Sequence, residues 1–486
     1  MNRRQFLGAC AAVPAFLRGA AGDRPNILLL MTDQHRGDCV GAAGNRAIHT
    51  PNLDRLAQGG ALFSNAYSST PTCTPARAAL LTGMSPWNHG MLGYGQVAEH
   101  YAVEMPALLH NAGYRTTGIG KMHWHPQRAL HGFDQTILDE SGRVESKDFR
   151  SDYRSWFLSE DPDGDADATG IDWNGYAAKR YALPEHLHPT SWTGETAVRF
   201  LREYQRPEPF FLKVSFERPH SPYDPPKRWW DRYEGALPRA EAGEWAAKFR
   251  PPSDKGPAPW HGDFGADIAQ NARRGYYGSI SFVDEQIGRI LETLDRRGWL
   301  KRTLILFLAD HGDMLGDQFL WRKSYAYEGS SHIPMILHWP EGFSPRGAIR
   351  NPVEIRDVLP TFLDAAGAAM SGIDGASLLR LARNPNAQWR EWIDLEHDVC
   401  YAKENHWNAL TDGRRKFIFH ALKGEEQFFD LEKDPHELRP IQSPEASQWR
   451  ERLIAHLEPR GPQWVADGKL QKRPQSQLYS PNYPRG

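Results

Sequence analysis

Residues 26–33 read NILLLMTD, and this stretch predicts the fold. Its apolar run is continuous rather than alternating and ends on a carboxylate. That is typical of a buried parallel strand whose polar end lies at the carboxyl edge of the sheet. The same pattern returns in TLILFLADHG at 303–312, and a third run, FFLKVSF at 210–216, ends close to Pro219-His220. We therefore expect parallel strands that bring polar residues to one edge of a sheet.

Helical patterns lie between these strands, at residues 74–82, 103–112, 193–204 and 277–297. The last of them places Ile280, Val283, Ile287 and Leu294 at helical spacing. Strands that alternate with helices predict an α/β fold with a large, mostly parallel sheet sandwiched by helices. Ligands of such sheets bind outside the carboxyl ends of the strands, so we expect the functional site there.

The pattern changes after about residue 370. The runs NHWNALT at 405–411 and RKFIFH at 415–420 flank Asp412-Gly413, which is a strong hairpin signal. A further strand at 426–431 and a helix at 448–457 complete a smaller C-terminal subdomain with an antiparallel sheet. We expect a main domain over 23–370, this subdomain over 371–486, and a Pro-rich tail from Arg473 without evident core residues. Two weakly periodic segments, 140–190 and 234–270, are expected to be insertions at the rim of a pocket.

Composition excludes several classes of protein. The chain has 486 residues, and 58 Lys and Arg against 60 Asp and Glu give a net charge of -2. A nucleic-acid binder held by counterion release would need a basic surplus. Hydrophobic residues make up 40% of the chain, which is enough for a sizeable core. No stretch approaches the roughly 20 apolar residues that span a bilayer, so an integral membrane protein is not expected.

The first 22 residues have the organisation of an export signal. Arg3 and Arg4 precede an apolar run over 6–17, and small residues follow at 19–22. The arginine pair favours a twin-arginine signal, with a Sec signal as the alternative. We therefore expect a periplasmic or secreted protein whose residues 1–22 are removed. Four cysteines are too few for a disulfide scaffold, and loss of Cys10 with the signal leaves an odd number.

The sharpest local signal is TCTPAR at 72–77, followed by an apolar stretch and LTG at 81–83. Cys73 precedes a predicted helix whose dipole, together with Arg77, would stabilise an anion on the sulfur. Thr74 is a candidate cap for this helix, and Pro75 is suited to its first turn. A buried structural cysteine is the alternative, because short motifs recur by chance.

Cys-x-Pro-x-Arg with a downstream Leu-Thr-Gly resembles the signature of the sulfatases. Four further segments resemble sulfatase elements in the same order: the strand 26–33 with its metal-binding acid, GKMH at 120–123, Pro219-His220, and ADHGDMLG at 309–316 with Lys323 after it. The resemblance covers most of residues 24–435. It implies an alkaline-phosphatase-like fold and the hydrolysis of a sulfate monoester.

The resemblance also implies the chemistry. A formylglycine-generating enzyme would oxidise Cys73 to formylglycine, whose hydrate has two hydroxyl groups. One hydroxyl would attack sulfur, and the second would then expel sulfate and restore the aldehyde. The remaining implied roles are that Arg77 holds the hydrate, Lys121 and Lys323 contact the sulfate, His220 protonates the leaving alcohol, and His123 deprotonates the hydrate.

A divalent metal is the implied cofactor, because an anionic ester needs positive charge in a preorganised site. Its expected ligands are Asp33, Gln34, Cys73, Asp310 and His311. The resemblance implies calcium. Many sulfatases have Asp at position 34 and Asn at position 311, however, and the amide and imidazole found here leave magnesium or manganese open.

The substrate is less well defined than the reaction. Export favours a sulfated carbohydrate, with 6-O-sulfated N-acetylglucosamine or a glycosaminoglycan fragment as the first candidate, since 217–223 resembles a segment of sulfatases that act on amino sugars. Candidate sugar contacts lie at the start of the C-terminal sheet, with packing in the core or hairpin as the alternative: Glu396, His397, Asn405, His406, Trp407 and Asn408.

Two alternatives from other classes stay open at this point. Phosphonate monoester hydrolases and phosphodiesterases share the cysteine signature but tend to lack Gly-Lys-x-His, which is present here at 120–123. A catalytically inactive carbohydrate-binding protein on the same scaffold would have lost site residues, and none of the core positions is lost.

Overall fold

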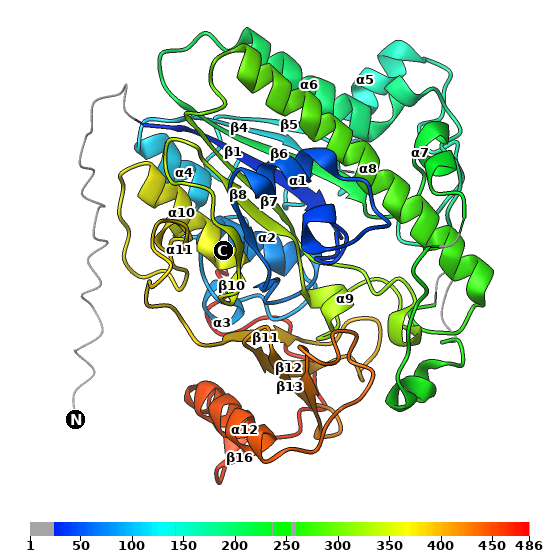
Figure 1. Ribbon diagram of the computed structural model, residues 1–486, viewed down its shortest axis with the longest axis vertical. Coiled ribbons are helices and arrows are strands. Elements are labelled where there is room, and N and C mark those ends of the chain that lie inside the picture. The colour runs from blue at the N-terminus through cyan, green and yellow to red at the C-terminus, as the bar shows by residue number, and fades with distance from the viewer. Residues whose placement is uncertain (1–23, 141, 236, 254–258, 486) are drawn as a thin grey trace.

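The computed structural model describes residues 24–140, 142–235, 237–253 and 259–485. At its centre lies an eight-stranded sheet (Figure 1). In spatial order its strands are β5 (Gln135–Leu138), β4 (Arg115–Gly120), β6 (Phe210–Pro219), β1 (Asn26–Asp33), β7 (Thr303–Ala309), β8 (Met335–His338), β2 (Ala61–Phe63) and β9 (Gly347–Ile349). The first five are parallel and β8 is antiparallel to β7, so the sheet is mixed but mostly parallel.

Strand β1 lies between β6 and β7, and the register brings three strand ends together. Asp33 pairs with Pro219 on one side, and Thr32 pairs with Ala309 on the other. The residues that follow β6 and β7, His220 and Asp310, therefore begin at the level of Asp33. The predicted polar edge of the sheet is confirmed.

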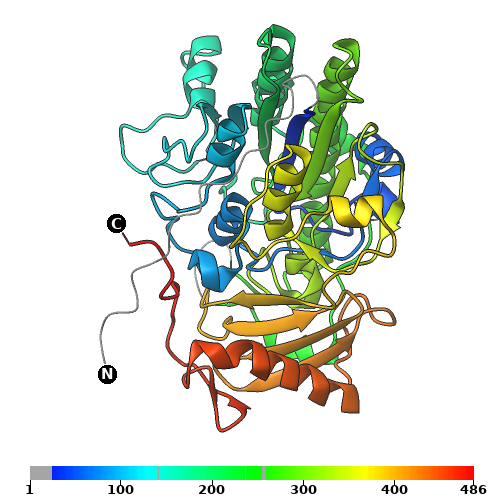
Figure 2. The same cartoon turned by 90° about the vertical axis from the view of Figure 1, so that its left-hand side faces the viewer.

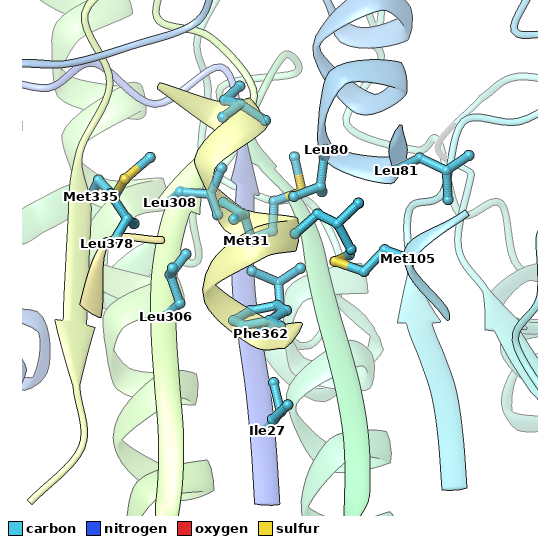
Figure 3. Close-up of a cluster of buried hydrophobic side chains, with 14 of the residues drawn as sticks. Ile27, Met31, Leu80, Leu81, Met105, Leu306, Leu308, Met335, Phe362 and Leu378 are labelled. Carbon is cyan, nitrogen blue, oxygen red and sulfur yellow. The ribbon is translucent and has the colours of Figure 1, made fainter. Parts of the chain in front are cut away.

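Both faces of the sheet are covered by helices, and this explains why β1 is apolar throughout. Ile27, Leu29 and Met31 face one core, and Leu28 and Leu30 face the other. The first core is closed by α2 (Cys73–Thr82), α4 (Met105–Asn111) and α10 (Val358–Ala365), and Figure 3 shows Phe362 of α10 over β1 and β7. The second is closed by α1 (Pro51–Gln58), α6 (Pro189–Glu203) and α8 (Ala266–Arg296).

A four-stranded antiparallel sheet forms the C-terminal part and lies at one end of the molecule (Figure 2). Its strands are β11 (Ile393–His397), β12 (Trp407–Thr411), β13 (Arg415–His420) and β14 (Glu425–Asp430). Helix α12 (Pro444–Leu457) packs Trp449 and Leu453 against one face. The other face packs against Leu320 and Tyr325, which flank Lys323, so this sheet supports a segment of the site.

The remaining elements are short. They are β3 (Ala66–Tyr67), β10 (Val353–Glu354), β15 (Val465–Ala466), β16 (Lys469–Leu470), α3 (Pro86–His89), α5 (Asp152–Glu160), α7 (Lys227–Arg232), α9 (Glu328–Ser331) and α11 (Leu379–Arg383). Helix α11 lies beyond residue 370 yet packs Leu379 and Leu381 into the core of the large sheet. The small sheet itself begins at Ile393.

The structure differs from the sequence-based expectation at several points. Helix α8 begins at Ala266 rather than near 277, because glycines that weaken the helical pattern are needed for packing: a Cβ at Gly275 would lie 2.6 Å from the carbonyl oxygen of Tyr223. The first turn of α2 begins at Cys73, so Thr74 is inside the helix and does not cap it. The Pro-rich tail contributes Tyr479 and Tyr483 to the large core.

Three further points concern the export signal, membrane-spanning helices and the cysteines. The predicted export signal, 1–22, lies outside the described residues. Among the residues that are described, no helix is both long and apolar enough to cross a membrane. Cys39, Cys73 and Cys400 are free thiols, so the structure contains no disulfide between the cysteines it describes.

Candidate active site

Cys73 is placed at the amino-terminal end of α2 and is fully buried. The helix ends at Gly83, which adopts a left-handed conformation with φ 67° and explains the glycine of Leu-Thr-Gly. Thr72, just before the helix, contacts His397 Nε2 through its hydroxyl at 2.9 Å. The end of α2 that carries Cys73 is therefore held against the first strand of the small sheet.

Two carboxylates face Cys73 from the ends of β1 and β7, and Arg77 joins them. Arg77 Nε donates to Asp310 Oδ2 at 3.0 Å, and its Nη2 donates to Asp33 Oδ2 at 3.2 Å. Its Nη1 donates to the carbonyl oxygen of Lys121 at 2.6 Å. Because Arg77 is one turn along α2 from Cys73, this network fixes the helix end relative to three loops at the edge of the sheet.

Lys121 and Lys323 complete the cationic lining. Lys121 forms an ion pair with Asp33, and Lys323 Nζ lies 3.2 Å from Cys73 Sγ. The glycine before Lys121 is required by the packing: Gly120 has φ 89°, and a Cβ there would lie 2.2 Å from the carbonyl oxygen of Ser215. The Gly-Lys pair thus turns the chain sharply at the end of β4 and directs the lysine into the site.

The charges of this cluster act on the cysteine and on Asp33. Burial and Asp33 would raise the pKa of the Cys73 thiol, but Lys323, Lys121 and His311 together lower that pKa to about 7. Burial also opposes the charged form of Asp33, yet the surrounding cations, Lys121 foremost, hold its pKa well below the usual range. The site therefore favours an anion at position 73.

The described residues fit a divalent cation. Ligand atoms of Asp33, Cys73, Asp310 and His311 lie within 4.8 Å of one another, and all four residues are buried. His311 Nδ1 contacts the carbonyl oxygen of Gly312 at 2.9 Å. This contact makes Nδ1 the protonated nitrogen and leaves the Nε2 lone pair directed at the cluster, as a metal ligand requires.

Gln34 supplies a further oxygen. Its Nε2 donates to Asp313 Oδ2 at 2.5 Å, and because a carboxylate accepts, the amide orientation is fixed. Its Oε1 is left buried without a hydrogen-bond partner among the described residues. Gln34 also has φ 67°, a left-handed conformation that is rare outside glycine and occurs here next to Asp33. A buried, oriented and unpaired amide oxygen is suited to a cation.

The two predicted acid–base histidines lie on either side of the cluster. His220 Nε2 lies 2.9 Å from Lys323 Nζ, and its Nδ1 contacts the carbonyl oxygen of Ser221 at 3.0 Å. His123 also has φ 60°, and its backbone N–H donates to Glu140 at 2.9 Å while its Nδ1 has no partner among the described residues. Burial, and then nearby cations, hold the pKa of both imidazoles well below the usual range.

The predicted sugar contacts divide into two groups. Glu396, His397, His406, Trp407 and Asn408 line a cavity of about 360 Å³ beside the C-terminal tail. Asn405 lines a different, smaller cavity, together with Trp407.

Several of these side chains are already engaged. Arg460 binds the Glu396 carboxylate at 2.6 and 2.9 Å, and Trp407 Nε1 donates to the carbonyl oxygen of Ser324 at 2.9 Å. Burial lowers the pKa of both His397 and His406 to about 4. The role of this group in sugar binding stays a prediction.

Sequence reasoning missed four residues around the site. Asp313 orients Gln34 and also accepts a hydrogen bond from the Tyr223 hydroxyl. Arg143 and Trp173 belong to the segment 140–190, and the Trp173 ring stacks on that of His220 at 6.3 Å with an interplanar angle of 13°. Asp313 lies inside the quoted segment 309–316, so the sequence offered a signal for it. Nothing in the sequence pattern marks Arg143 or Trp173.

Comparison with known proteins identifies the family. The family model described as Sulfatase matches residues 25–368, and one described as N-sulphoglucosamine sulphohydrolase, C-terminal, matches 316–460. An arylsulfatase of Clostridium perfringens is 38% identical, covering 92% of this chain and 98% of that protein. The chain belongs to the sulfatase family. It is a sulfuric ester hydrolase.

Other relatives differ in what they act on. A choline-sulfatase of Rhizobium meliloti is 31% identical over 91% of this chain and 87% of that protein. An N-acetylglucosamine-6-O-sulfatase of Bacteroides thetaiotaomicron is 27% identical over 86% of this chain and 82% of that protein. The family is therefore clear, whereas the relatives' names point to more than one class of leaving alcohol.

Solved structures confirm the alkaline-phosphatase-like fold. A phosphonate monoester hydrolase of Agrobacterium radiobacter superposes with a TM-score of 0.75 at 26% identity, covering 89% of this chain and 95% of that one. A protein solved with its substrate D-glucosamine-2-N,6-O-disulfate superposes with a TM-score of 0.72 at 24% identity, covering 90% and 97%. Both share the arrangement of a large sheet between helices.

Proposed function

We propose that this sulfatase hydrolyses a sulfate monoester of a carbohydrate through a formylglycine made from Cys73. The observation that carries the proposal is the buried cluster in which Cys73 faces Asp33, His311 and Lys323 at 3.7, 3.2 and 3.2 Å. Formylglycine supplies two geminal hydroxyls when hydrated, one to attack sulfur and one to release sulfate. An unmodified cysteine would lack the second hydroxyl.

The other side chains have distinct tasks in this proposal. Lys121 and Lys323 neutralise the charge of the bound sulfate in a site from which water is excluded. Arg77 holds the hydrate through its position one turn along α2. The negative charge of a bound sulfate ester would oppose the cations that lower the pKa of His220. His220 would then carry the proton that it delivers to the leaving oxygen, while the neutral His123 takes a proton from the hydrate.

A divalent cation would be held by Asp33, Gln34, Asp310 and His311 together with residue 73. Bound there, it would supply positive charge and lower the pKa of the hydrate hydroxyl. Calcium is the first candidate because the ligands other than His311 offer oxygen once residue 73 is a formylglycine hydrate, and the imidazole keeps magnesium and manganese as alternatives.

The proposed substrate is 6-O-sulfated N-acetylglucosamine or a glycosaminoglycan fragment. Support comes from the relative named for N-acetylglucosamine-6-O-sulfate. The second candidate is a phosphonate monoester, since the first solved neighbour hydrolyses one. The presence of both Lys121 and His123 in the site favours the sulfate ester. An inactive scaffold is disfavoured because every predicted core residue is retained.

One assay separates these candidates. The enzyme is produced in a host with formylglycine-generating machinery, and kcat/KM is measured for 6-sulfated N-acetylglucosamine, an aryl sulfate and an aryl phosphonate, with Cys73→Ala as the inactive control. We expect release of inorganic sulfate, with the phosphonate the poorest substrate. A phosphonate hydrolysed more efficiently than every sulfate ester would replace the proposal by the second candidate.

We also propose that residues 1–22 direct export through the twin-arginine route to the periplasm. The support is the order of the arginine pair, apolar run and small residues. Replacing both arginines by lysine should retain the protein in the cytosol. Export that is unaffected by this change would favour a Sec signal.

A further inference from the structure

Arg143, at the edge of the active site, forms no ion pair with the part of the chain that the structure describes. The Nε and Nη1 atoms of Arg143 are buried and lack a hydrogen-bond partner among the described residues. Lys121, in contrast, pairs with Asp33, and Arg77 pairs with both Asp33 and Asp310. Two buried N–H groups of a guanidinium that lack partners are costly, so this arrangement suggests that a bound ligand completes the coordination of Arg143.

The backbone of Arg143 is fixed to the segment after β4, which carries Lys121 and His123. Its N–H donates to the carbonyl oxygen of Glu140 at 3.2 Å, and its own carbonyl oxygen accepts from Gln127 Nε2 at 3.3 Å. Glu140 in turn accepts from the backbone N–H of His123 at 2.9 Å. Arg143 is therefore held relative to His123 rather than on an independent loop.

The side chain of Arg143 lies on the side of the site where the alcohol leaves. Its Cζ lies 4.9 Å from the centroid of the Trp173 ring, and that ring stacks on His220, the proposed acid for the leaving alcohol. Trp173 is 36% exposed, so it borders solvent. The chain next to Trp173 is anchored by a hydrogen bond, because Arg322 Nη1 donates to the carbonyl oxygen of Asn174 at 3.3 Å.

The scissile sulfate does not need Arg143. Lys121 and Lys323 already face residue 73, and both are fully or almost fully buried at the bottom of the site. The neighbours of Arg143, Gly142 and Val144, are exposed, which places the arginine at the rim. Its charge nevertheless helps to lower the pKa of Lys121 and His123, after burial, so it is close to both.

We propose that Arg143 binds a second anionic group, carried by the alcohol part of the substrate. The inference rests on the proposed sulfatase function. Of the two proposed substrates it favours the glycosaminoglycan fragment, which can carry a carboxylate or a further sulfate near the scissile one, over 6-O-sulfated N-acetylglucosamine, which has no second anionic group. Guanidinium recognises both groups through paired hydrogen bonds. The sulfate ester of a cationic alcohol such as choline would meet an uncompensated positive charge and should be a poor substrate.

Three fluorogenic esters test this directly. They are the 7-sulfates of 4-methyl-7-hydroxycoumarin, of 7-hydroxycoumarin-4-acetate and of 7-hydroxycoumarin-4-methanesulfonate, which share one ring and differ in the remote group. The wild type should prefer the acidic esters. Arg143→Gln should reduce kcat/KM for the two acidic coumarin sulfates roughly 10- to 100-fold more than for the 4-methylcoumarin sulfate. Arg143→Lys should retain part of the preference. The two acidic probes distinguish carboxylate from sulfonate recognition.

A matched control is Arg380→Gln, which alters an arginine whose Cζ lies 6.0 Å from the Trp389 ring, on α11. Arg380→Gln should leave kcat/KM unchanged for all three coumarin sulfates. A purely structural role for Arg143 would lower kcat/KM of all three esters equally, and this outcome would overturn the proposal. Equal activity of Arg143→Gln and wild type on the acidic esters would overturn it as well.

A binding measurement separates this inference from the proposed reaction. In the Cys73→Ala background the esters stay intact, and calorimetry gives Kd for each. The coumarin sulfate with the 4-acetate group should bind more tightly than the one with the 4-methyl group. This difference in Kd should vanish when Arg143→Gln is added. If the wild type hydrolyses no sulfate ester, the proposed function fails, while this preference still reports on Arg143. Absence of the preference overturns the inference.

Discussion

The Nζ of Lys323 lies 3.2 Å from the Sγ of Cys73, although 250 residues separate them in the chain. Cys73 is held by α2, and Lys323 belongs to a segment supported by the small C-terminal sheet. The cation thus reaches the nucleophile only when the two parts of the molecule pack together. This contact couples the C-terminal sheet to the reaction.

Replacing Lys323 by Gln should lower kcat about 100-fold or more, as does the loss of one preorganised donor at a developing negative charge. The measurement is kcat at saturating aryl sulfate, with formylglycine content determined for both proteins. Lys248→Gln, which removes an exposed lysine near Glu425, is the control and should keep full activity. Near-normal kcat in a fully converted Lys323→Gln protein would show that the lysine does not act on the sulfate.

Metal binding should be detectable without any assay of activity. Removing divalent cations with EDTA and adding calcium back should raise Tm, because a ligand that binds only the native state stabilises it by mass action. Asp310→Asn should abolish most of that shift, since Asp310 is one of the two carboxylates of the cluster. Glu292→Gln, on the exposed face of α8, should leave the shift intact. A calcium-dependent Tm in Asp310→Asn equal to that of the wild type would exclude this ligand set.

His220→Ala should affect poor leaving groups more than good ones. A nitrophenolate departs without a proton, whereas a sugar hydroxyl needs one, so loss of a general acid is felt mainly by the sugar sulfate. We expect the fall in kcat/KM for a sugar sulfate to exceed that for nitrophenyl sulfate at least ~10-fold. His125→Ala, which removes a half-exposed imidazole near Glu145, is the control. Equal losses on both esters would assign His220 another role.

Stability should depend on pH through buried neutral histidines. Burial lowers the pKa of His89 to about 3, whereas an unfolded histidine titrates near pH 6.5. Between these values the unfolded state binds a proton that the native state does not, so the free energy of unfolding falls as the pH falls from 6.5 toward 3. This one group contributes about 1.4 kcal/mol per pH unit in that window.

His89→Gln removes this contribution. Urea unfolding at pH 7.5, 6 and 5 should show a weaker loss of stability on acidification for the variant than for the wild type. His110→Gln, at a half-exposed imidazole near Asp134, serves as the control. An unchanged pH dependence in His89→Gln would mean that His89 is protonated in the native state over this range.

The sequence was sufficient for the central strands and the core of the site. Apolar runs that end in Asp33 and Asp310 became β1 and β7, with bounds 26–33 and 303–309. Such strands are buried on both faces, so their composition alone reveals them. The motif glycines follow from geometry as well, since Gly120 and Gly83 adopt conformations that other residues disfavour.

Contacts between distant segments could not be predicted. Arg143 and Trp173 lie in an insertion with weak periodicity, and only the fold stacks Trp173 on His220 and places Arg143 against Trp173. Glu396 is a reasonable sugar ligand by residue type, but Arg460, 64 residues later, binds its carboxylate. Which polar groups remain available for a ligand depends on such pairings, and these are set by tertiary packing.

The most direct test of the account is the chemical state of Cys73. The protein is purified from a host that contains formylglycine-generating enzyme, and the peptide with residues 72–77 is analysed by mass spectrometry, with an established sulfatase converted in parallel. The account predicts formylglycine or its hydrate at position 73. An unmodified thiol there, while the parallel sulfatase is fully converted, would contradict it.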